Sequence, residues 1–310
     1  MKGLELARQY YEAFGRQLLE QFPQASPYLA VGLAGSGSEC CGFDDETSRD
    51  HDFEPGFCIF LPGEDVVDRR TAFLLERAYA KLPKEFMGLR RSPMDPVGGN
   101  RHGVIRMADF FLEKTGTADG ELSLQQWFSV PEQSLLEATN GAVFSDLFGA
   151  FTAIREKLKY LPEAVRRKKL AGELLLMGQA GQYNYSRCIA RGETGGAQLA
   201  AFEFVKSAIH GIYLLNGAYM PYYKWCFRGL KGLPRLGALA DHLEALISTG
   251  NDPQEAEKKQ ALIEGVCCSF TDALQNLTGL PSAEMERQAY ALNDTIADPT
   301  VRNLHILCGV

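Results

Sequence analysis

The pattern of apolar residues changes near residue 130, and this change limits what the chain can fold into. Before that point, short apolar runs at 28–34 and 57–61 are bounded by Gly, Pro and Ser, which is typical of buried strands. A stripe at three- and four-residue steps covers residues 4–22 and ends at Pro23, which predicts an opening helix. From about Glu132, long helical patterns replace the strand signals. The sequence therefore predicts an α+β head followed by an all-α helical bundle.

We expect the head to span residues 1–130 and the bundle to span residues 131–310. In the head, a helix at 65–82 and a third strand at 103–107 would complete a small mixed sheet with helices. The bundle is expected to contain helices at 149–160, 162–190, 197–216, 233–247 and 252–277. Glycines at 192, 195 and 196 predict a turn between two of these helices.

Composition indicates a soluble globular protein with a substantial core, since 45% of the 310 residues are hydrophobic and 23% are charged. The formal net charge of −7 opposes broad attraction to DNA or to an anionic membrane surface. The amino end lacks the apolar stretch of a signal peptide, and no apolar window of about 18 residues would span a membrane. The eight cysteines form no C-x-x-C pair, so we expect reduced, mostly buried thiols. These features predict a cytoplasmic protein.

The densest group of polar residues lies between the first two predicted strands. Gly37 would let the backbone approach a phosphate, and Ser36 and Ser38 can donate hydrogen bonds to it. Asp50 and Asp52 are two residues apart, so on an extended segment both carboxylates face the same way and can hold a divalent cation. Taken singly, a Gly-Ser pair is typical of a simple turn, and an Asp-x-Asp pair of a solvated edge.

The combination is more specific than its parts. Gly37-Ser38 is followed after 11 residues by Asp50-x-Asp52, with a predicted strand on either side. This arrangement resembles the signature of the polymerase-beta-like nucleotidyltransferase superfamily. The patterns at 37–61, 141–165 and 221–225 look like an uncharacterised bacterial branch of that superfamily, with a domain of unknown function and a C-terminal helical domain.

The resemblance implies a nucleotidyltransferase-like head and a metal-dependent reaction. It implies that Asp50 and Asp52 hold Mg²⁺ or Mn²⁺, and that Gly37 and Ser38, with Ser36 beside them, hold the phosphates of an NTP, for which ATP is expected. It further implies that an NMP, expected to be AMP, moves to a hydroxyl or phosphate of an unidentified acceptor while pyrophosphate leaves.

The chain departs from the superfamily pattern in one respect. Active members supply a third carboxylate from a later strand, whereas the corresponding segment at 102–107 contains no acid. Asp109 or another carboxylate could substitute, or the site holds one metal. The remaining alternative is a catalytically inactive nucleotide-binding regulatory or interaction protein that keeps the fold.

The helical half contains further candidates. Arg187 and Arg191 are four residues apart on one helical face and could meet phosphates, although a pair of surface arginines is the alternative. Lys224 lies in an aromatic cluster that could stack a base or an acceptor ring while the Lys224 ammonium reaches a triphosphate; the alternative is that the aromatics belong to the core. His210 lies on an apolar helix and is expected to be a hydrogen-bonded core histidine.

Spacing does not decide between Glu173 and Glu203 as a general base that would deprotonate an acceptor hydroxyl. A small-molecule acceptor is favoured over protein or RNA, because the chain is acidic and shows no basic stripe with interleaved aromatics. A phosphohydrolase built around residues 50–52 is disfavoured, because the other histidines are scattered. The oligomeric state and the base preference do not follow from the sequence.

Overall fold

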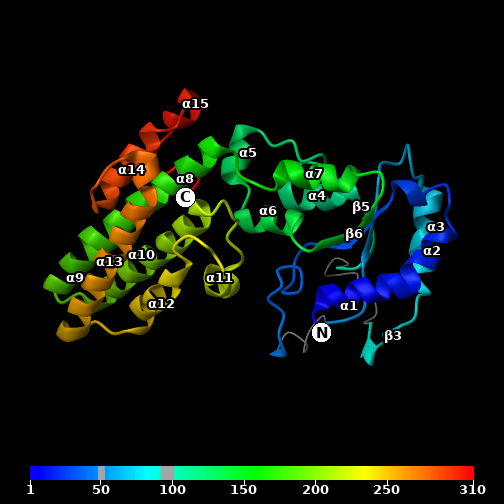
Figure 1. Ribbon diagram of the computed structural model, residues 1–310, viewed down its shortest axis with the longest axis horizontal. Coiled ribbons are helices and arrows are strands. Elements are labelled where there is room, and N and C mark those ends of the chain that lie inside the picture. Colours follow the sequence, from blue (N-terminus) through cyan, green and yellow to red (C-terminus); the bar gives the residue numbers. More distant parts are fainter. Residues whose placement is uncertain (48–52, 92–100) are drawn as a thin grey trace. The chain divides into compact units, whose positions relative to one another are not determined.

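The computed structural model describes residues 1–47, 53–91 and 101–310 of the chain (Figure 1). The chain forms two compact units, which are treated separately below. The head unit comprises residues 1–126 and 130–159, and the helical unit comprises residues 127–129 and 160–310. The fold class is α+β, as the sequence predicts, with a small mixed sheet and many helices.

The head unit is built on a four-stranded sheet within the described residues. Its strands are β1 (Ala30–Leu33), β2 (Cys58–Leu61), β5 (Gly103–Arg106) and β6 (Ala142–Asp146). Their order across the sheet is β5-β2-β1-β6. β1 is antiparallel to both of its neighbours, whereas β2 and β5 are parallel. The three strands expected from the sequence are thus confirmed, and a short hairpin of β3 (Glu85–Phe86) and β4 (Leu89–Arg90) accompanies them.

The fourth strand, β6, extends the head unit beyond the boundary that the sequence predicts. The sequence places that division at residue 130, whereas β6 pairs with β1 and the head unit continues to Lys159. All five residues of β6 are only half-buried, so the strand lacks the continuous apolar run that marks β1 and β2. Its sequence signal is therefore weak.

Helices cover both faces of this sheet. Residues Tyr10, Val31 and Ile59 belong to a cluster formed by the opening helix, α3 and one sheet face. Phe60 points to the other face, where its ring stacks on Phe151 with centroids 4.0 Å apart. The described helices of the head are α1 (Gly3–Tyr10), the π-helical η1 (Tyr11–Gly15), α2 (Arg16–Glu20), the 3-10 helical η2 (Ser26–Tyr28), α3 (Arg69–Ala80), α4 (Met107–Thr115), α6 (Glu132–Thr139) and α7 (Ala150–Leu158). The short helix α5 (Leu124–Ser129) begins in the head unit, and its last three residues belong to the helical unit.

The helical unit, all of which the structure describes, contains helices and no strand. Its main elements are α8 (Glu163–Met177), the π-helical η4 (Gly178–Tyr185), α9 (Ser186–Ala190), α10 (Thr194–Leu215), α11 (Tyr223–Leu230), α12 (Ala240–Ser248), α13 (Pro253–Thr278), α14 (Met285–Asp294) and α15 (Pro299–Arg302). The pattern at 162–190 is one continuous run of helical turns, as predicted. Of the three glycines expected in the following turn, only Gly192 lies there, because α10 already begins at Thr194. α12 begins at Ala240, later than the pattern at 233–247 indicates.

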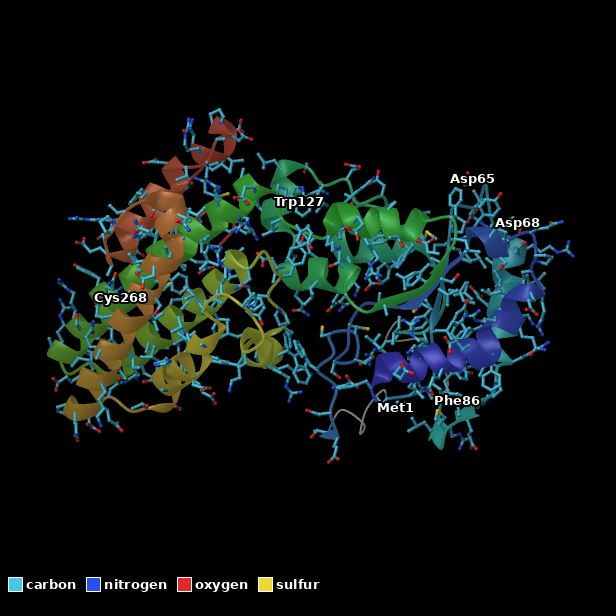
Figure 2. The ribbon with its side chains drawn as sticks, in the orientation of Figure 1. Met1, Asp65, Asp68, Phe86, Trp127 and Cys268 are labelled. Carbon is cyan, nitrogen blue, oxygen red and sulfur yellow. The ribbon has the colours of Figure 1, made fainter. Side chains whose placement is uncertain are left out.

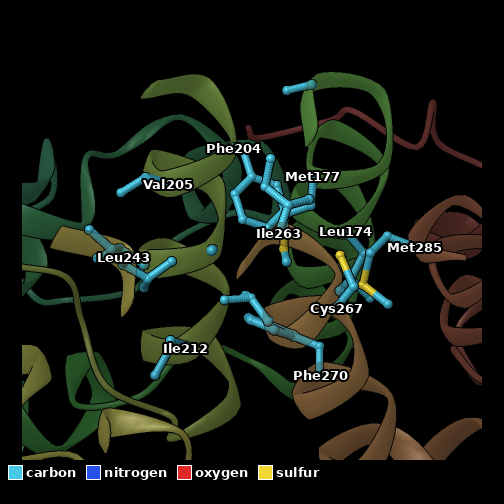
Figure 3. Packing of buried hydrophobic residues seen from close by; sticks show 14 of the residues in the cluster. Leu174, Met177, Phe204, Val205, Ile212, Leu243, Ile263, Cys267, Phe270 and Met285 are labelled. Atoms are coloured by element: carbon cyan, nitrogen blue, oxygen red, sulfur yellow. The ribbon is translucent and has the colours of Figure 1, made fainter. Parts of the chain in front are cut away.

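The core of the helical unit forms where α8, α10, α13 and α14 meet (Figure 3). Phe204 of α10 packs beside Ile263 of α13, and Leu174 of α8 lies close to Met285 of α14. Each of these four side chains is fully buried. Among the helices in the described residues, none combines the length and the apolar character that a membrane span requires.

Two fully buried lysines help to hold this unit together. The Nζ atom of Lys168 donates to Asn293 Oδ1 at 2.6 Å and to the carbonyls of Arg302 and Leu304 at 2.9 Å. Lys259 also donates to three uncharged acceptors. Because burial disfavours the charged form, it lowers the pKa of both ammonium groups. Lys168 thereby ties the C-terminal segment to α8.

The adjacent cysteines of α13 test the orientation of that helix. Cys267 is buried in the core (Figure 3), and burial raises the pKa of its thiol. Cys268 is exposed on the surface (Figure 2). Because thiolate fraction and access set the rate of alkylation, Cys268 should react with a thiol reagent fastest in the native protein. Cys268→Ser should remove the fastest phase of alkylation, and Cys267→Ala should leave that phase unchanged. The opposite result would show that α13 turns the Cys267 side to solvent and the Cys268 side to the core.

Candidate functional site

Strand pairing brings three chain segments to one edge of the head sheet. Gly32 near the end of β1 lies opposite Cys58 at the beginning of β2. Cys58 in turn lies opposite Gly103 at the beginning of β5. The Gly-Ser segment 35–38, which follows β1, therefore shares an edge with the residues that lead into β2 and with Arg101, which leads into β5.

Asn140 fixes the start of the Gly-Ser segment from a distant part of the chain. Its side-chain Oδ1 accepts a hydrogen bond from the backbone N–H of Gly35 at 2.9 Å, and its Nδ2 donates to the Gly35 carbonyl at 2.8 Å. Arg155 of α7 donates to the Asn140 carbonyl at 2.5 Å. Burial lowers the pKa of the Arg155 guanidinium. No sequence signal marks Asn140, because an Asn-Gly pair reads as an ordinary turn.

Gly37 lies at the most crowded point of this segment. Its φ of +123° is a conformation that side-chain-bearing residues rarely adopt. A Cβ atom there would overlap the guanidinium of Arg101 and lie 2.6 Å from Oε1 of Glu39. Arg101 and Glu39 form an ion pair beside Gly37, and Arg101 also donates to the Ser36 carbonyl at 3.0 Å. The pair is largely buried, with side-chain exposures of 27% for Arg101 and 12% for Glu39.

A hollow of about 360 Å³ opens beside the segment. It is lined by Gly35 and Ser36 after β1, by Arg101 and the strand β5, and by residues of α3 and α4. Six of its lining side chains carry charge, three basic and three acidic: Arg101, Arg106, Lys114, Glu76, Asp109 and Glu113. The hollow is thus a polar site of mixed charge at the edge of the sheet.

Two lining groups have structural roles within the fold. Nη1 of Arg106 donates to the carbonyls of Pro62 and Val67 at 2.7 Å and so holds the segment after β2. The Cys58 thiol, which also lines the hollow, donates to the Arg101 carbonyl at 3.2 Å. Burial raises the pKa of Cys58 to about 12, which makes this thiol a poor nucleophile near neutral pH.

The predicted phosphate-binding residues of the head, Ser36, Gly37 and Ser38, are consecutive in the chain, and their contact with phosphate stays a prediction. Ser36 is exposed, whereas Gly37 and Ser38 are half-buried, and the Ser38 carbonyl accepts from the Phe43 N–H at 2.8 Å. Asp50 and Asp52 lie outside the described residues, and their role as metal ligands stays a prediction. The described residues contain no group of three or more His, Cys, Asp or Glu side chains that could hold a metal ion.

The strand that should carry the third carboxylate is β5, and it contains no acid, in agreement with the sequence. Asp109 is exposed in the first turn of α4 and lines the hollow. It follows the far end of β5, however, whereas the Gly-Ser segment lies at the near end. The structure therefore gives Asp109 a place in the hollow without showing a carboxylate at the centre of the strand.

The basic candidates of the helical half are exposed. The guanidinium of Arg187 lies 4.6 Å from the ring centroid of Tyr183, and Arg191 is exposed after the end of α9. Nζ of Lys224 lies 5.0 Å from the ring centroid of Trp225. They belong to the helical unit, whereas Gly37 belongs to the head unit, so their contribution to a phosphate site stays a prediction.

His210 is a hydrogen-bonded core histidine, as the sequence predicts. Its Nδ1 lies 2.5 Å from Oε1 of Glu173, and both side chains are largely buried. This contact occupies the Glu173 carboxylate. Glu203 lies on α10 with its Oε1 3.6 Å from the Nζ of Lys206 and is half-exposed.

Comparison with known proteins finds one family model that matches part of the chain. Residues 127–226, about a third of the chain, match a family described as a domain of unknown function (DUF4037). No curated protein matches the chain. One solved structure, a nucleotidyltransferase-like protein from Exiguobacterium sibiricum, aligns over 86% of this chain and 79% of its own, with 11% identity and a TM-score of 0.33. This degree of structural similarity is low.

The backbone at Gly37 generates a stability prediction. Gly37→Ala should destabilise the protein by about 1–3 kcal/mol through its positive φ alone, and by more because the methyl group displaces the Arg101–Glu39 pair. In an Arg101→Ala background this extra cost should be smaller. Denaturant unfolding should therefore show a coupling free energy of about 0.5 kcal/mol or more between the two substitutions.

Gly42→Ala is the matched control. Gly42 has a φ of +73° and open space where a Cβ would lie, so only a backbone cost of about 1–2 kcal/mol is expected. That cost should be the same with and without Arg101. If the cost of Gly37→Ala were also the same with and without Arg101, the result would contradict the close approach of Arg101 to Gly37.

Proposed function

We propose that the protein is a metal-dependent nucleotidyltransferase that moves an NMP, with AMP favoured, from an NTP to an acceptor. The observation that carries this proposal is the shared sheet edge. The Gly-Ser segment after β1 and the described residues 53–57, which lead into β2, share this edge because β1 and β2 are antiparallel neighbours. Asp50 and Asp52 precede residues 53–57 in the sequence. A glycine-rich turn that offers backbone N–H groups, beside a pair of carboxylates, suits a nucleotide triphosphate with its metal.

Each residue then has a chemical task. Gly37 lets the phosphates approach the backbone, and the hydroxyls of Ser36 and Ser38 donate hydrogen bonds to phosphate oxygens. Asp50 and Asp52 would hold Mg²⁺ or Mn²⁺, which neutralises charge on the α-phosphoryl oxygens and on the departing pyrophosphate. The acceptor oxygen forms a bond to the α-phosphorus, the bond from that phosphorus to pyrophosphate breaks, and a hydroxyl acceptor gives its proton to a base.

The acceptor is proposed to be a small molecule. The acidic composition and the mixed charge of the hollow favour this class over a long polyanion such as RNA. Arg187 and Lys224 remain candidates for phosphate contacts from the helical unit, and Trp225, with Arg228 and Lys224 over its ring, is a candidate platform for stacking a base.

A second function is favoured by one observation. Because β5 carries no acid and Asp109 follows its far end, the head could bind nucleotide without transferring it. The protein would then be a regulatory or interaction protein that senses nucleotide. Both functions share the nucleotide site and differ in turnover.

Thermal melting tests nucleotide binding, which both functions require. An NTP with Mg²⁺ at about 100 times its Kd should stabilise the wild type by about 2.7 kcal/mol, and so raise its Tm by several degrees. The Asp50→Asn, Asp52→Asn double variant should lose this shift. Glu20→Gln with Asp65→Asn removes the same charge at exposed positions outside the motif and should keep the shift. No shift with any of the four NTPs in any protein would contradict the proposal.

Pyrophosphate release separates the two functions. Incubation of the wild type with the stabilising NTP, Mg²⁺ and a pool of small hydroxyl and phosphate compounds should release pyrophosphate, and Asp50→Asn should reduce the rate by a factor of 100 or more, on the order of several kcal/mol in the barrier. Binding without release across the pool would favour the regulatory function.

A further inference from the structure

The carboxylate of Glu39 lies beside the backbone of Gly37, where the proposed function places a phosphate. Gly37 has no side chain, and the space where a Cβ would lie is filled first by Nη2 of Arg101 and next by the Glu39 carboxylate, whose Oε1 and Oε2 lie 2.6 and 2.7 Å from that position. Glu39 is only two residues further along the chain, so it reaches back over its own turn. An internal anion thus lies against the backbone that the proposed function assigns to phosphate.

Arg101 is the cation that could pair with either the Glu39 carboxylate or a ligand phosphate. Its guanidinium pairs with Glu39 and donates to the Ser36 carbonyl, and it comes from the segment that leads into β5. The planar guanidinium can bind a phosphate with two parallel hydrogen bonds, as it binds a carboxylate. A phosphate carries more charge and more acceptor oxygens than Glu39, so it can replace Glu39 as the partner of Arg101.

We propose that Arg101 binds the terminal phosphates of the nucleotide and that Glu39 is an internal substitute that holds Arg101 over Gly37 until the nucleotide arrives. This inference rests on the proposed function, and it adds a binding residue and a competing group to that site. Arg101 then favours a triphosphate over a monophosphate, and each binding event breaks the Arg101–Glu39 ion pair. Glu39 lowers the affinity for phosphate and keeps the empty turn from attracting other anions.

The experiment measures binding by isothermal titration calorimetry with the full chain. The probes are the NTP that stabilises the wild type, the corresponding NMP, and inorganic tripolyphosphate, each with Mg²⁺. Arg101→Ala should weaken NTP and tripolyphosphate binding about 10- to 100-fold and change NMP binding by less than about threefold. Glu39→Gln should tighten NTP binding by about threefold or more, because the neutral amide competes poorly for Arg101.

Matched controls are Arg90→Ala and Glu85→Gln, which change the same charges at exposed positions of the small hairpin. Both should bind the NTP as the wild type does. Arg101→Lys should recover part of the lost affinity, which a purely structural loss would not show. A circular dichroism melt identifies any variant that fails to fold, and Glu39→Gln remains informative in that case because it predicts a gain.

The possible outcomes distinguish a failure of this inference from a failure of the proposed function. If the wild type binds the NTP and Arg101→Ala binds it equally well, or Glu39→Gln weakens it, the inference is overturned and the proposed function stands. If the wild type binds tripolyphosphate through Arg101 but no NTP, the anion site stands and the proposed function fails. If the wild type binds neither probe, both are overturned.

Discussion

The antiparallel pairing of β1 with β2 is the constraint on which the rest of the head depends. β1 lies between β2 and β6, so both of its edges are paired, and helices on both faces of the sheet bury its short apolar sequence. The pairing sends the chain from the end of β1 to the edge where β2 and β5 begin. Every polar group proposed to contact phosphate in the head lies at that edge. Asn140 fixes the start of the Gly-Ser segment through two hydrogen bonds to the backbone of Gly35.

Much of this fold can be predicted from the sequence, because burial on both faces of the sheet leaves continuous apolar runs. The residues of β1 and β2 are all buried, and both strands are evident in the sequence. β6 is half-buried and mixes Ala, Phe, Ser and Asp, so neither an apolar run nor a clear alternation marks it. Pairing of β6 with β1 is a long-range contact, and it draws residues 130–159 into the head unit.

The site is less accessible to sequence reasoning than the fold. Gly37 and Ser38 can be recognised in the sequence because glycine and serine mark a turn that can hold an anion. In the structure they follow Gly35 and Ser36, which line the hollow. Arg101 and Asn140 leave no local signal, since each acts on residues more than 60 positions away. The parallel register of β2 and β5 brings in Arg101, and the segment before β6 brings in Asn140, so both depend on strand pairing rather than on a motif.

The proposed function and the proposed role of Glu39 together predict an exchange of anions at one turn, in which the Glu39 carboxylate gives way to the phosphates of a nucleotide. The most direct measurement is a crystal structure of the full chain with a non-hydrolysable NTP analogue and Mg²⁺. We expect the phosphates to lie against Gly37 and Ser38, with Arg101 turned from Glu39 to the terminal phosphate. A nucleotide bound elsewhere, with the Arg101–Glu39 pair intact over Gly37, would contradict the account.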